Sequence, residues 1–408
     1  MKITIHRGTD QIGGCVTEYE NEGWRLFVDY GEQLPGAKHT EPLNIEGLTK
    51  GDLSKSALLI THYHGDHIGC ITEIPDAVPM YIGKVGRDIQ LVLSHHLMSV
   101  DDLQKEVVAK LEKARTFDPG IPFVFGPFII TPVIIDHSAF DAYAFKIEAA
   151  GKSAFHTGDF RTHGFRSGNL AKVINTYVGH VDYVVCEATN VSRPDATNKS
   201  EHALQQDFFN RFKANKGNIV YVSTTNIDRI FALYHAALRA HRPFYVDSYQ
   251  KQIMDKVTQR DTIWGKSSLY RYGKYEPVVL HKEFRMNDKF REHLEHKGYV
   301  LLARANSRYN NLIAQMPGEK EKYLSMWKGY VDKKCIAFNP TLAEAVGDHF
   351  EYLHTSGHCD MQGMAQFFQL LSPKEIIPIH TENPDKFVEL FGNKWNVLRV
   401  HDGESINF

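Results

Sequence analysis

The segment Thr61-His62-Tyr63-His64-Gly65-Asp66-His67 places three imidazoles and one carboxylate within six successive positions. Imidazole nitrogens and carboxylate oxygens are ligands that suit zinc or manganese. In an extended segment, side chains repeat with period two, so His62 and His64 point the same way and can bind one ion. Asp66 and His67 follow the bend at Gly65 and can turn to a second ion. A group of solvated surface histidines is the alternative, but this spacing favours a metal centre.

Two further polar clusters follow apolar strand candidates. Asp136-His137-Ser138 comes after Phe128–Ile135, and His156-Thr157-Gly158-Asp159-Phe160-Arg161 comes after Ser153–Phe155. A single His or Asp at a strand end is more often a cap or turn residue than a ligand. With the first cluster in the same chain, the ligand interpretation is favoured for His137 and Asp159.

The elements that position these residues form an α/β pattern in the first 190 residues. Several strand candidates end directly in a polar cluster, and loops at the carboxyl ends of strands are where α/β sheets build their sites. Between them, Leu103–Arg115 has the periodicity of an amphipathic helix. The strand candidates are Lys2–His6, Arg25–Val28, Ala57–Ile60, Phe128–Ile135, Tyr143–Ile147, Ser153–Phe155 and Tyr183–Cys186.

The middle of the chain, residues 191–352, differs in pattern and charge. It holds 26 Lys and Arg against 18 Asp and Glu, whereas the remainder holds 21 against 31. A basic lobe suggests a polyanionic substrate, although charge alone fits a chance asymmetry equally well. Helices alternate with strands, which predicts a second α/β unit with a parallel sheet. The helices are Ala203–Ala214, Ile227–Ala240 and Tyr249–Val257, and the strands are Ile219–Val222, Phe244–Val246, Tyr299–Leu302 and Cys335–Ala337.

The tail returns to the pattern of the first part. It has a polar loop at His354–Asp360, helices at Met361–Leu371 and Pro384–Phe391, and strands at Glu375–Ile379 and Asn396–Val400. The simplest topology is one domain, built from residues 1–190 and 353–408, that is interrupted by the inserted lobe 191–352.

Several classes of protein are disfavoured by composition. No run of about 18 apolar residues exists, so a membrane span is not expected, and the first residues lack the apolar region of a secretory signal. The five cysteines are widely spaced without a CxxC pair, which argues against a disulfide framework and for a reducing compartment. We therefore expect a cytoplasmic protein without a membrane partner.

The ordered set of clusters resembles the motifs of the metallo-β-lactamase superfamily. The resemblance implies an αβ/βα sandwich with two divalent ions, zinc or alternatively manganese. It assigns His62, His64 and His137 to one ion, Asp66 and His67 to the other, and Asp159 to both. Asp29, which follows Leu26-Phe27-Val28, resembles the first motif, an aspartate that orients the ligands without touching an ion.

Three later features resemble motifs A, B and C of the β-CASP nucleases, a branch with an inserted α/β lobe between motifs A and B. They are Glu187 in Cys186-Glu187-Ala188, His358 in Ser356-Gly357-His358, and His380 in Pro378-Ile379-His380. The resemblance makes His380 a ligand of the second ion. It implies that a bridging hydroxide attacks the scissile phosphate, with Asp66, Glu187 and His358 as catalytic residues. His358 would contact the phosphate, perform general acid catalysis and be oriented by Glu187. His358→Ala should then lower turnover sharply and leave the metal content unchanged.

Within this branch the chain is most similar to the ribonuclease J group, through Ser223–Ile230 and Thr381-Glu382. Glu187 stands where that group usually has Asp, and the Thr-Gly-Ser-Gln-Gly-Glu segment that holds the RNA 5′ end is replaced by Ala303–Asn310. Ser307, Arg308 and Ser356 are candidate phosphate contacts. We expect the group's additional C-terminal domain to be absent, which leaves the oligomeric state open.

The expected substrate is single-stranded RNA, cleaved as an exonuclease, an endonuclease or both. The run Tyr270-Arg271-Tyr272-Gly273-Lys274-Tyr275 could stack on unpaired bases, although packing in a core explains it equally well. A DNA nuclease of the Artemis kind and a small-molecule hydrolase are the alternatives, and a non-catalytic scaffold ranks last because every ligand position is filled. The sequence leaves the native metal, the polarity and the preference for RNA over DNA open.

Overall fold

The computed structural model describes residues 1–37, 41–259 and 266–407. By its internal contacts the chain divides into two compact units, Met1–Thr197 with Gly357–Phe408, and Asn198–Ser356. The expected boundaries followed residues 190 and 352, whereas the contacts place them after residues 197 and 356. Each unit has its own sheets and core and is described separately.

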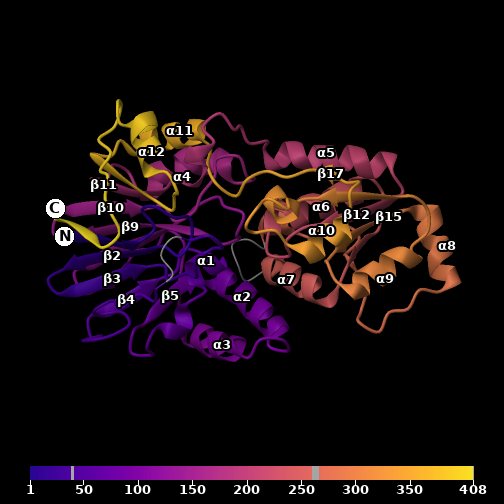
Figure 1. The fold of residues 1–408 in the computed structure, drawn as a ribbon, viewed down its shortest axis with the longest axis horizontal. Helices are drawn as coiled ribbons and strands as arrows, with labels where there is room; N and C mark the ends of the chain where they lie inside the picture. The colour runs from indigo at the N-terminus through magenta and orange to yellow at the C-terminus, as the bar shows by residue number, and fades with distance from the viewer. Residues whose placement is uncertain (38–40, 260–265, 408) are drawn as a thin grey trace. The chain divides into compact units, whose positions relative to one another are not determined.

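The first unit contains two sheets (Figure 1). One has the order β19-β1-β2-β3-β4-β5-β6, and the other has the order β18-β11-β10-β9-β8-β7. Because β1 pairs with β19, the two ends of the described chain lie side by side. The strands of the first sheet are β1 (Lys2–Arg7), β2 (Val16–Asn21), β3 (Trp24–Val28), β4 (Ser56–Leu59), β5 (Met80–Gly83), β6 (Arg115–Phe117) and β19 (Glu404–Asn407). Those of the second are β7 (Phe123–Phe125), β8 (Phe128–Ile134), β9 (Tyr143–Ala149), β10 (Lys152–His156), β11 (Tyr183–Glu187) and β18 (Glu375–Ile379).

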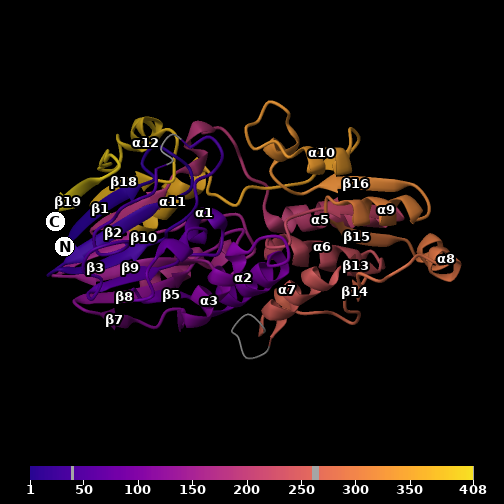
Figure 2. The ribbon, with the colours of Figure 1, turned by 60° about the horizontal axis from the view of Figure 1, so that its bottom comes forward.

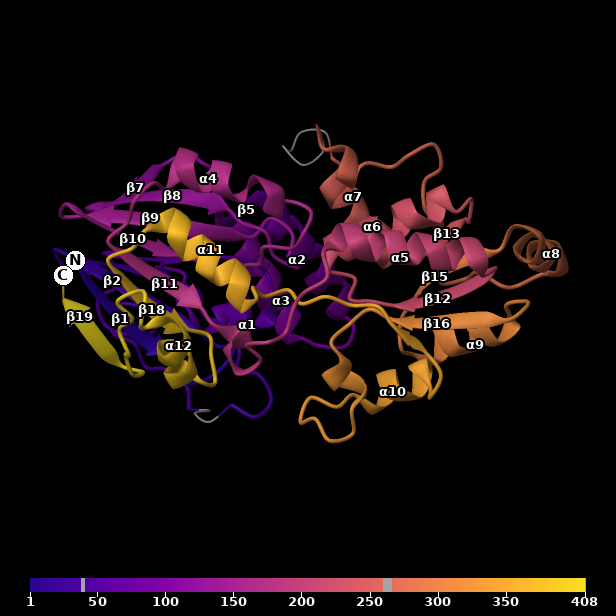
Figure 3. The same cartoon turned by 90° about the horizontal axis from the view of Figure 1, so that it is seen from above.

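Alternating side chains join these sheets into a four-layer αβ/βα sandwich. On β11, Tyr183 and Val185 face a core shared with Leu26 and Leu59 of the other sheet, whereas Val184 faces helices on the outer side. This alternation follows from the period of two in a strand. Figure 3 shows α4 (Leu170–Tyr177), α11 (Met361–Leu371) and α12 (Pro384–Phe391) over the second sheet. The first sheet is covered by α1 (Gly65–Ile68), α2 (Lys84–Leu97) and α3 (Leu103–Lys113).

The strands that precede the polar clusters point toward one edge of the sandwich. In the second sheet β10, β11 and β18 are parallel, and β8 shares their direction because β9 is antiparallel to both of its neighbours. In the first sheet β3 and β4 are parallel. The carboxyl ends of parallel strands meet at one edge, so the topology gathers the clusters that follow them.

The second unit has a fully parallel six-stranded sheet in the order β14-β13-β15-β12-β16-β17. In Figure 2 the labels β16, β15, β13 and β14 follow one another in this order, and in Figure 1 α5 lies above this sheet and α9 below it. The strands are β12 (Gly217–Tyr221), β13 (Phe244–Val246), β14 (Val278–Val279), β15 (Tyr299–Ala303), β16 (Lys320–Leu324) and β17 (Glu351–Tyr352). The helices are α5 (Glu201–Ala214), α6 (Ile227–Arg239), α7 (Ser248–Thr258), α8 (Asp288–Lys297), α9 (Ser307–Gln315) and α10 (Pro340–Val346).

The sandwich and the parallel sheet confirm the predicted fold class, but two predicted strands are wrong. Cys335–Ala337 forms turns, and Ile336 there is 72% exposed, so no neighbouring strand covers it. The position beside β12 is filled by β16 instead. Asn396–Val400 makes only one isolated bridge, from Val397 to Ile376. The helix predicted over Leu103–Arg115 ends at Lys113, because Arg115 begins β6.

Among the described residues, no helix is both long and apolar enough to cross a membrane.

Candidate metal centre

The predicted ligands converge in the first unit. Three groups form, of which two share Asp159 and His380, and within each group the potential ligand atoms lie within 4.8 Å of one another. The groups are His62, His64 and His137; Asp66, His67, Asp159 and His380; and Asp159, Glu187, His358 and His380. The sequence places these residues across more than three hundred positions, and the strand ends described above bring them together.

Asp159 lies at the centre of the cluster. Its Oδ2 is 3.2 Å from His67 Nε2 and 3.9 Å from both His62 Nε2 and His137 Nε2. Its Oδ1 is 3.6 Å from His380 Nδ1 and is buried without a hydrogen-bond partner. A buried carboxylate oxygen normally has a partner, so this atom is suited to a cation. The donor set therefore fits divalent ions on both sides of Asp159.

The first group has the protonation state that metal binding needs. His64 Nδ1 is 3.1 Å from His62 Nε2 and 3.2 Å from His137 Nε2. Burial lowers the pKa of His64 to about 4, and it holds the pKa values of His62 and His137 well below the usual range. Neutral imidazole is the form that ligates a metal, so these three side chains are prepared for a cation.

The second group contains His67, Asp66 and His380. Asp66 Oδ2 is 3.2 Å from His380 Nε2 and 3.9 Å from His67 Nε2. Thr189 Oγ1 lies 2.8 Å from His380 Nδ1 and holds the ring from behind. His380 has a backbone φ of 53°, a left-handed conformation that is costly for a residue with a side chain. This strained conformation occurs directly after β18, where the His380 imidazole points into the cluster.

Asp29 holds the ligand loop without joining the three groups. Its Oδ1 accepts a hydrogen bond from Thr61 N at 2.8 Å, and its Oδ2 accepts one from Thr61 Oγ1 at 2.8 Å. Oδ2 also lies 2.8 Å from His67 Nδ1, which leaves Nε2 to face Asp159. Asp29 has a φ of 62°, a second strained position beside the site. Gly31 makes the close approach possible, because a Cβ there would lie 1.8 Å from Asp66 O.

This geometry predicts that Asp29→Ala weakens zinc binding about 10- to 100-fold, the usual cost of losing a group that orients ligands. Zinc affinity would be measured by competition with a chromophoric chelator. Asp182→Ala is the matched control, since this carboxylate accepts from Ser153 N at the start of β10, away from the cluster. Equal zinc affinity in the Asp29 variant and this control would remove the proposed orienting role.

The third group joins Glu187 and His358 to Asp159 and His380. Glu187 Oε2 accepts from Thr189 N at 2.9 Å, and Oε1 accepts from Cys359 N at 3.2 Å. His358 Nδ1 lies 3.6 Å from Glu187 Oε1 and 3.7 Å from Asp159 Oδ2. Burial disfavours the charged imidazole, but the carboxylates of Asp159 and Glu187 outweigh it and raise the pKa of His358 to about 9.

The side chain of His358 is more exposed to solvent than those of the buried imidazoles. Its side chain is 23% exposed, whereas His67, His137 and His380 are only 1% or 2% exposed. Asp66 is 14% exposed. A molecule that approaches the cluster therefore reaches His358, Asp66 and the partly exposed His64 before the buried ligands.

Sequence reasoning missed several residues that fix the ligands. Arg161 is fully buried and donates through Nε to Asp136 Oδ1 at 2.9 Å, which fixes the residue before His137. His137 Nδ1 lies 2.7 Å from Gly357 O, and a Cβ at Gly357 would lie 2.5 Å from Ser138 Oγ. Thr61 and Thr189 act in the same supporting manner. Their hydroxyls carry no pattern in the sequence, because their partners lie far away along the chain.

The candidate phosphate contacts Ser307, Arg308 and Ser356 belong to the second unit. Ser307 is the exposed first residue of α9. Arg308 donates through one guanidinium nitrogen to Leu280 O and His281 O, both at 2.8 Å. This side chain therefore links α9 to the segment that follows β14. A role of these residues in phosphate binding stays a prediction.

The aromatic run Tyr270–Tyr275, for which base stacking and packing were both open, is largely packed against other residues. Tyr270 is 1% exposed and donates to Asp228 Oδ1, and Tyr272 stacks on Phe231 and donates to Asp255 Oδ1. Tyr275 is 63% exposed. The packing explanation therefore holds for two of the three rings.

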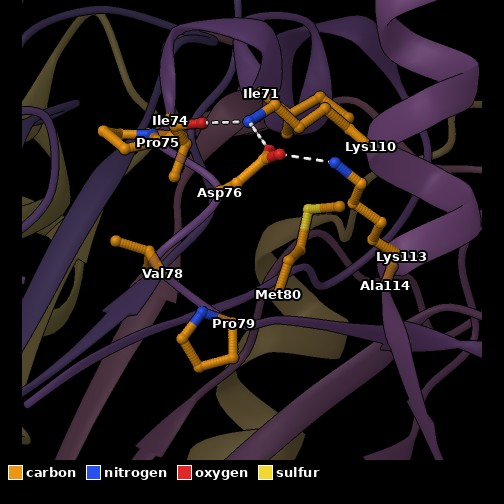
Figure 4. Close-up of a pocket in the computed structure, with 10 residues that line it drawn as sticks. All are labelled: Ile71, Ile74, Pro75, Asp76, Val78, Pro79, Met80, Lys110, Lys113 and Ala114. Atoms are coloured by element: carbon orange, nitrogen blue, oxygen red, sulfur yellow. Dashed lines mark hydrogen bonds and ion pairs between the residues drawn. The ribbon is translucent and has the colours of Figure 1, made fainter. Parts of the chain in front are cut away.

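The small hollow drawn in Figure 4 is distinct from the metal cluster. Asp76 at its rim pairs with Lys110 at 2.6 Å and with Lys113, so its charged groups largely satisfy one another. Its other lining residues are Ile71, Ile74, Pro75, Val78, Pro79, Met80 and Ala114. This hollow offers no group suited to catalysis.

Comparisons with known proteins agree with this site. The family model for RMMBL, described as a Zn-dependent metallo-hydrolase RNA specificity domain, matches residues 346–398, which include His358 and His380. Ribonuclease J of Helicobacter pylori (strain B128) is 21% identical over 94% of this chain and 56% of its own length. Ribonuclease J of Mycoplasma genitalium is 22% identical over 93% and 68%, respectively. These similarities to proteins named ribonuclease J are consistent with the metallo-β-lactamase/β-CASP family.

Other similarities are more limited. Ribonuclease J of Mycolicibacterium smegmatis is 25% identical over 59% of this chain and 43% of its own length, so the chain spans about half the length of the first curated relatives that it matches. A crystal structure of a protein of unknown function from Enterococcus faecalis V583 superimposes with a TM-score of 0.75 at 18% identity and covers 99% of both chains. This likeness shows that the fold is shared.

Proposed function

We propose that the protein is a metal-dependent hydrolase that cleaves phosphodiester bonds in single-stranded RNA. The observation that carries the proposal is the convergence of potential ligands on one buried carboxylate, Asp159, which belongs to two of the three groups and lies 3.9 Å from His62 and His137 of the third. The relatives named ribonuclease J and the matched RNA specificity domain favour RNA as the substrate. The basic balance of residues 191–352 fits a polyanion.

The two ions would be held by separate sets that share Asp159. His62, His64 and His137 would hold one ion, and Asp66, His67 and His380 would hold the other. When bound, such a pair of divalent ions supplies Lewis acidity and an activated water near neutral pH. The burial of most of these ligands keeps bulk water away, which strengthens electrostatic interactions within the site.

His358 is the group best placed to act on the scissile phosphate and the departing oxygen. Because Nδ1 faces Glu187 and Asp159, Nε2 lies on the opposite side of the ring and can present a proton to a substrate. A cationic imidazole would also neutralise charge on the phosphate oxygens in the transition state. Glu187 is fixed by two backbone N–H groups, so it acts as a positioning residue for His358.

The proposed activity is tested with single-stranded RNA and DNA labelled at either the 5′ or the 3′ end, in the presence of zinc or manganese. We expect RNA to be cleaved in preference to DNA, and the pattern of label release to give the polarity. Asp66→Ala is the control and should be inactive. Cleavage that persists in this variant would show contamination, and an inactive wild-type protein with bound metal would contradict the proposal.

A further inference from the structure

The second unit carries a group of exposed rings just after β16 and at the end of β17. Trp327 is 43% exposed, Tyr330 is 36% exposed and Tyr352 is 40% exposed. The rings of Trp327 and Tyr330 meet edge to face with centroids 5.5 Å apart. Lys328 Nζ lies 6.0 Å from the centroid of the Tyr352 ring. We call Trp327, Lys328, Tyr330 and Tyr352 the aromatic platform.

Backbone structure holds the aromatic platform in place. β16 and β17 are parallel neighbours, with Leu324 opposite Tyr352, so the Trp327 segment leaves the sheet beside Tyr352. Gly329 is buried, and a Cβ at this position would lie 2.5 Å from the Trp327 ring. Only glycine allows the indole to lie against the backbone in this manner. Tyr330 O accepts a hydrogen bond from Asn339 N at 2.8 Å, which ties the turn to the cap of α10.

The chemistry of the aromatic platform suits an unpaired nucleic acid strand. Every base has a flat π face, so exposed aromatic rings stack on bases with little dependence on sequence, while ammonium groups meet the phosphates. Residues 327–336 contain three lysines, Lys328, Lys333 and Lys334, against the single acid Asp332, and all four are exposed. The exposed Ile336 would suit an apolar protein partner, but this charge balance favours a polyanion.

A short stretch of chain connects the aromatic platform to the residues of the metal centre. Tyr352 lies six positions before His358 in the sequence, and six extended residues span at most about 22 Å. A substrate of several nucleotides is long enough to engage both places, whereas a very short one is not. Binding by stacking would therefore depend on substrate length.

We propose that the aromatic platform stacks unpaired bases of the substrate strand and thereby sets a preference for longer single-stranded substrates. This inference rests on the proposed function, because it concerns the same substrate. It adds a binding surface that involves residues from two separate parts of the sequence, Trp327–Tyr330 and Tyr352.

The test measures the affinity of a labelled single-stranded oligoribonucleotide by fluorescence anisotropy. Loss of one stacking ring costs about 1–3 kcal/mol, so Trp327→Ala and Tyr352→Ala should each weaken binding about 5- to 150-fold. Trp327→Phe keeps a ring and should restore most of the affinity. Tyr177→Ala removes a ring that is similarly exposed, 42%, on α4 of the first unit, and should bind as the wild type does.

The outcomes separate this inference from the proposed function. Equal affinity in the wild type, Trp327→Ala and Tyr352→Ala would overturn the role of the aromatic platform, even if cleavage is normal. Self-association that is lost in these variants while RNA affinity is unchanged would also overturn it and assign the surface to a second copy of the chain. Turnover of bis(4-nitrophenyl) phosphate by the wild type reports the metal centre separately, since this small diester cannot bridge to the rings.

Discussion

Asp159→Asn should abolish phosphodiesterase turnover and remove most of the bound metal. The substitution keeps the size of the side chain but removes the negative charge that lies within 3.9 Å of His62, His67 and His137. Both proposed ions lose a ligand, so the expected loss of turnover is at least about 10³-fold, more than mutagenesis finds for a single hydrogen-bond donor in an active site. Metal content per chain would be measured by plasma mass spectrometry, alongside turnover of labelled RNA.

His156→Asn provides the matched control for this variant. His156 is also a buried imidazole at a strand end, where its Nδ1 lies 3.2 Å from the Tyr19 hydroxyl, but it belongs to none of the three ligand groups. Burial lowers the pKa of His156 to about 4, so it is neutral like the proposed ligands. We expect this variant to retain the metal. Full metal content in Asp159→Asn would contradict the shared-ligand role of Asp159.

His358→Ala should lower turnover about 10²- to 10⁴-fold, the usual contribution of a general acid, while the protein keeps its full metal content. The reason is geometric, because His358 lies against the shared carboxylate and is far more exposed than the buried imidazoles. Single-turnover kinetics with a saturating concentration of RNA would measure the chemical step, and metal analysis of the same sample would test the separation of the two roles.

Glu187→Gln is the companion variant. Glutamine can keep one acceptor for the N–H groups of Thr189 and Cys359, but it removes the charge beside His358. We expect a smaller loss of turnover than in His358→Ala, and little additional loss when the two changes are combined, because they act as one unit. Wild-type turnover in His358→Ala would exclude the acid role, and loss of metal would instead indicate that His358 is a ligand.

The parts of the site that the sequence predicts are those that carry a local pattern. His62, His64, Asp66 and His67 are dense within one segment, and His137, Asp159 and His380 each follow an apolar strand, so strand direction predicts their convergence. The supporting contacts are different. Thr61, Thr189 and Arg161 become relevant only through partners that are distant in the sequence or through a backbone bend, such as the left-handed conformation of His380.

The same distinction explains the errors. Cys335–Ala337 is short and apolar, as a strand would be, but Ile336 stays exposed and the Lys320–Leu324 segment, which is rich in charges, pairs instead. The run from Tyr270 to Tyr275 has the composition of a stacking surface, but the rings of Tyr270 and Tyr272 pack within the second unit. Trp327 and Tyr352 are separated by 25 positions, and only the pairing of β16 with β17 brings their segments together.

The most direct test of the central claim is a crystal structure of zinc-loaded protein with anomalous diffraction recorded at the zinc edge. Two peaks about 3.5–4 Å apart are expected, one beside His62, His64 and His137 and the other beside Asp66, His67 and His380, with Asp159 in contact with both. No peak beside Asp159, or peaks only at surface histidines, would contradict the assignment of a two-metal hydrolase.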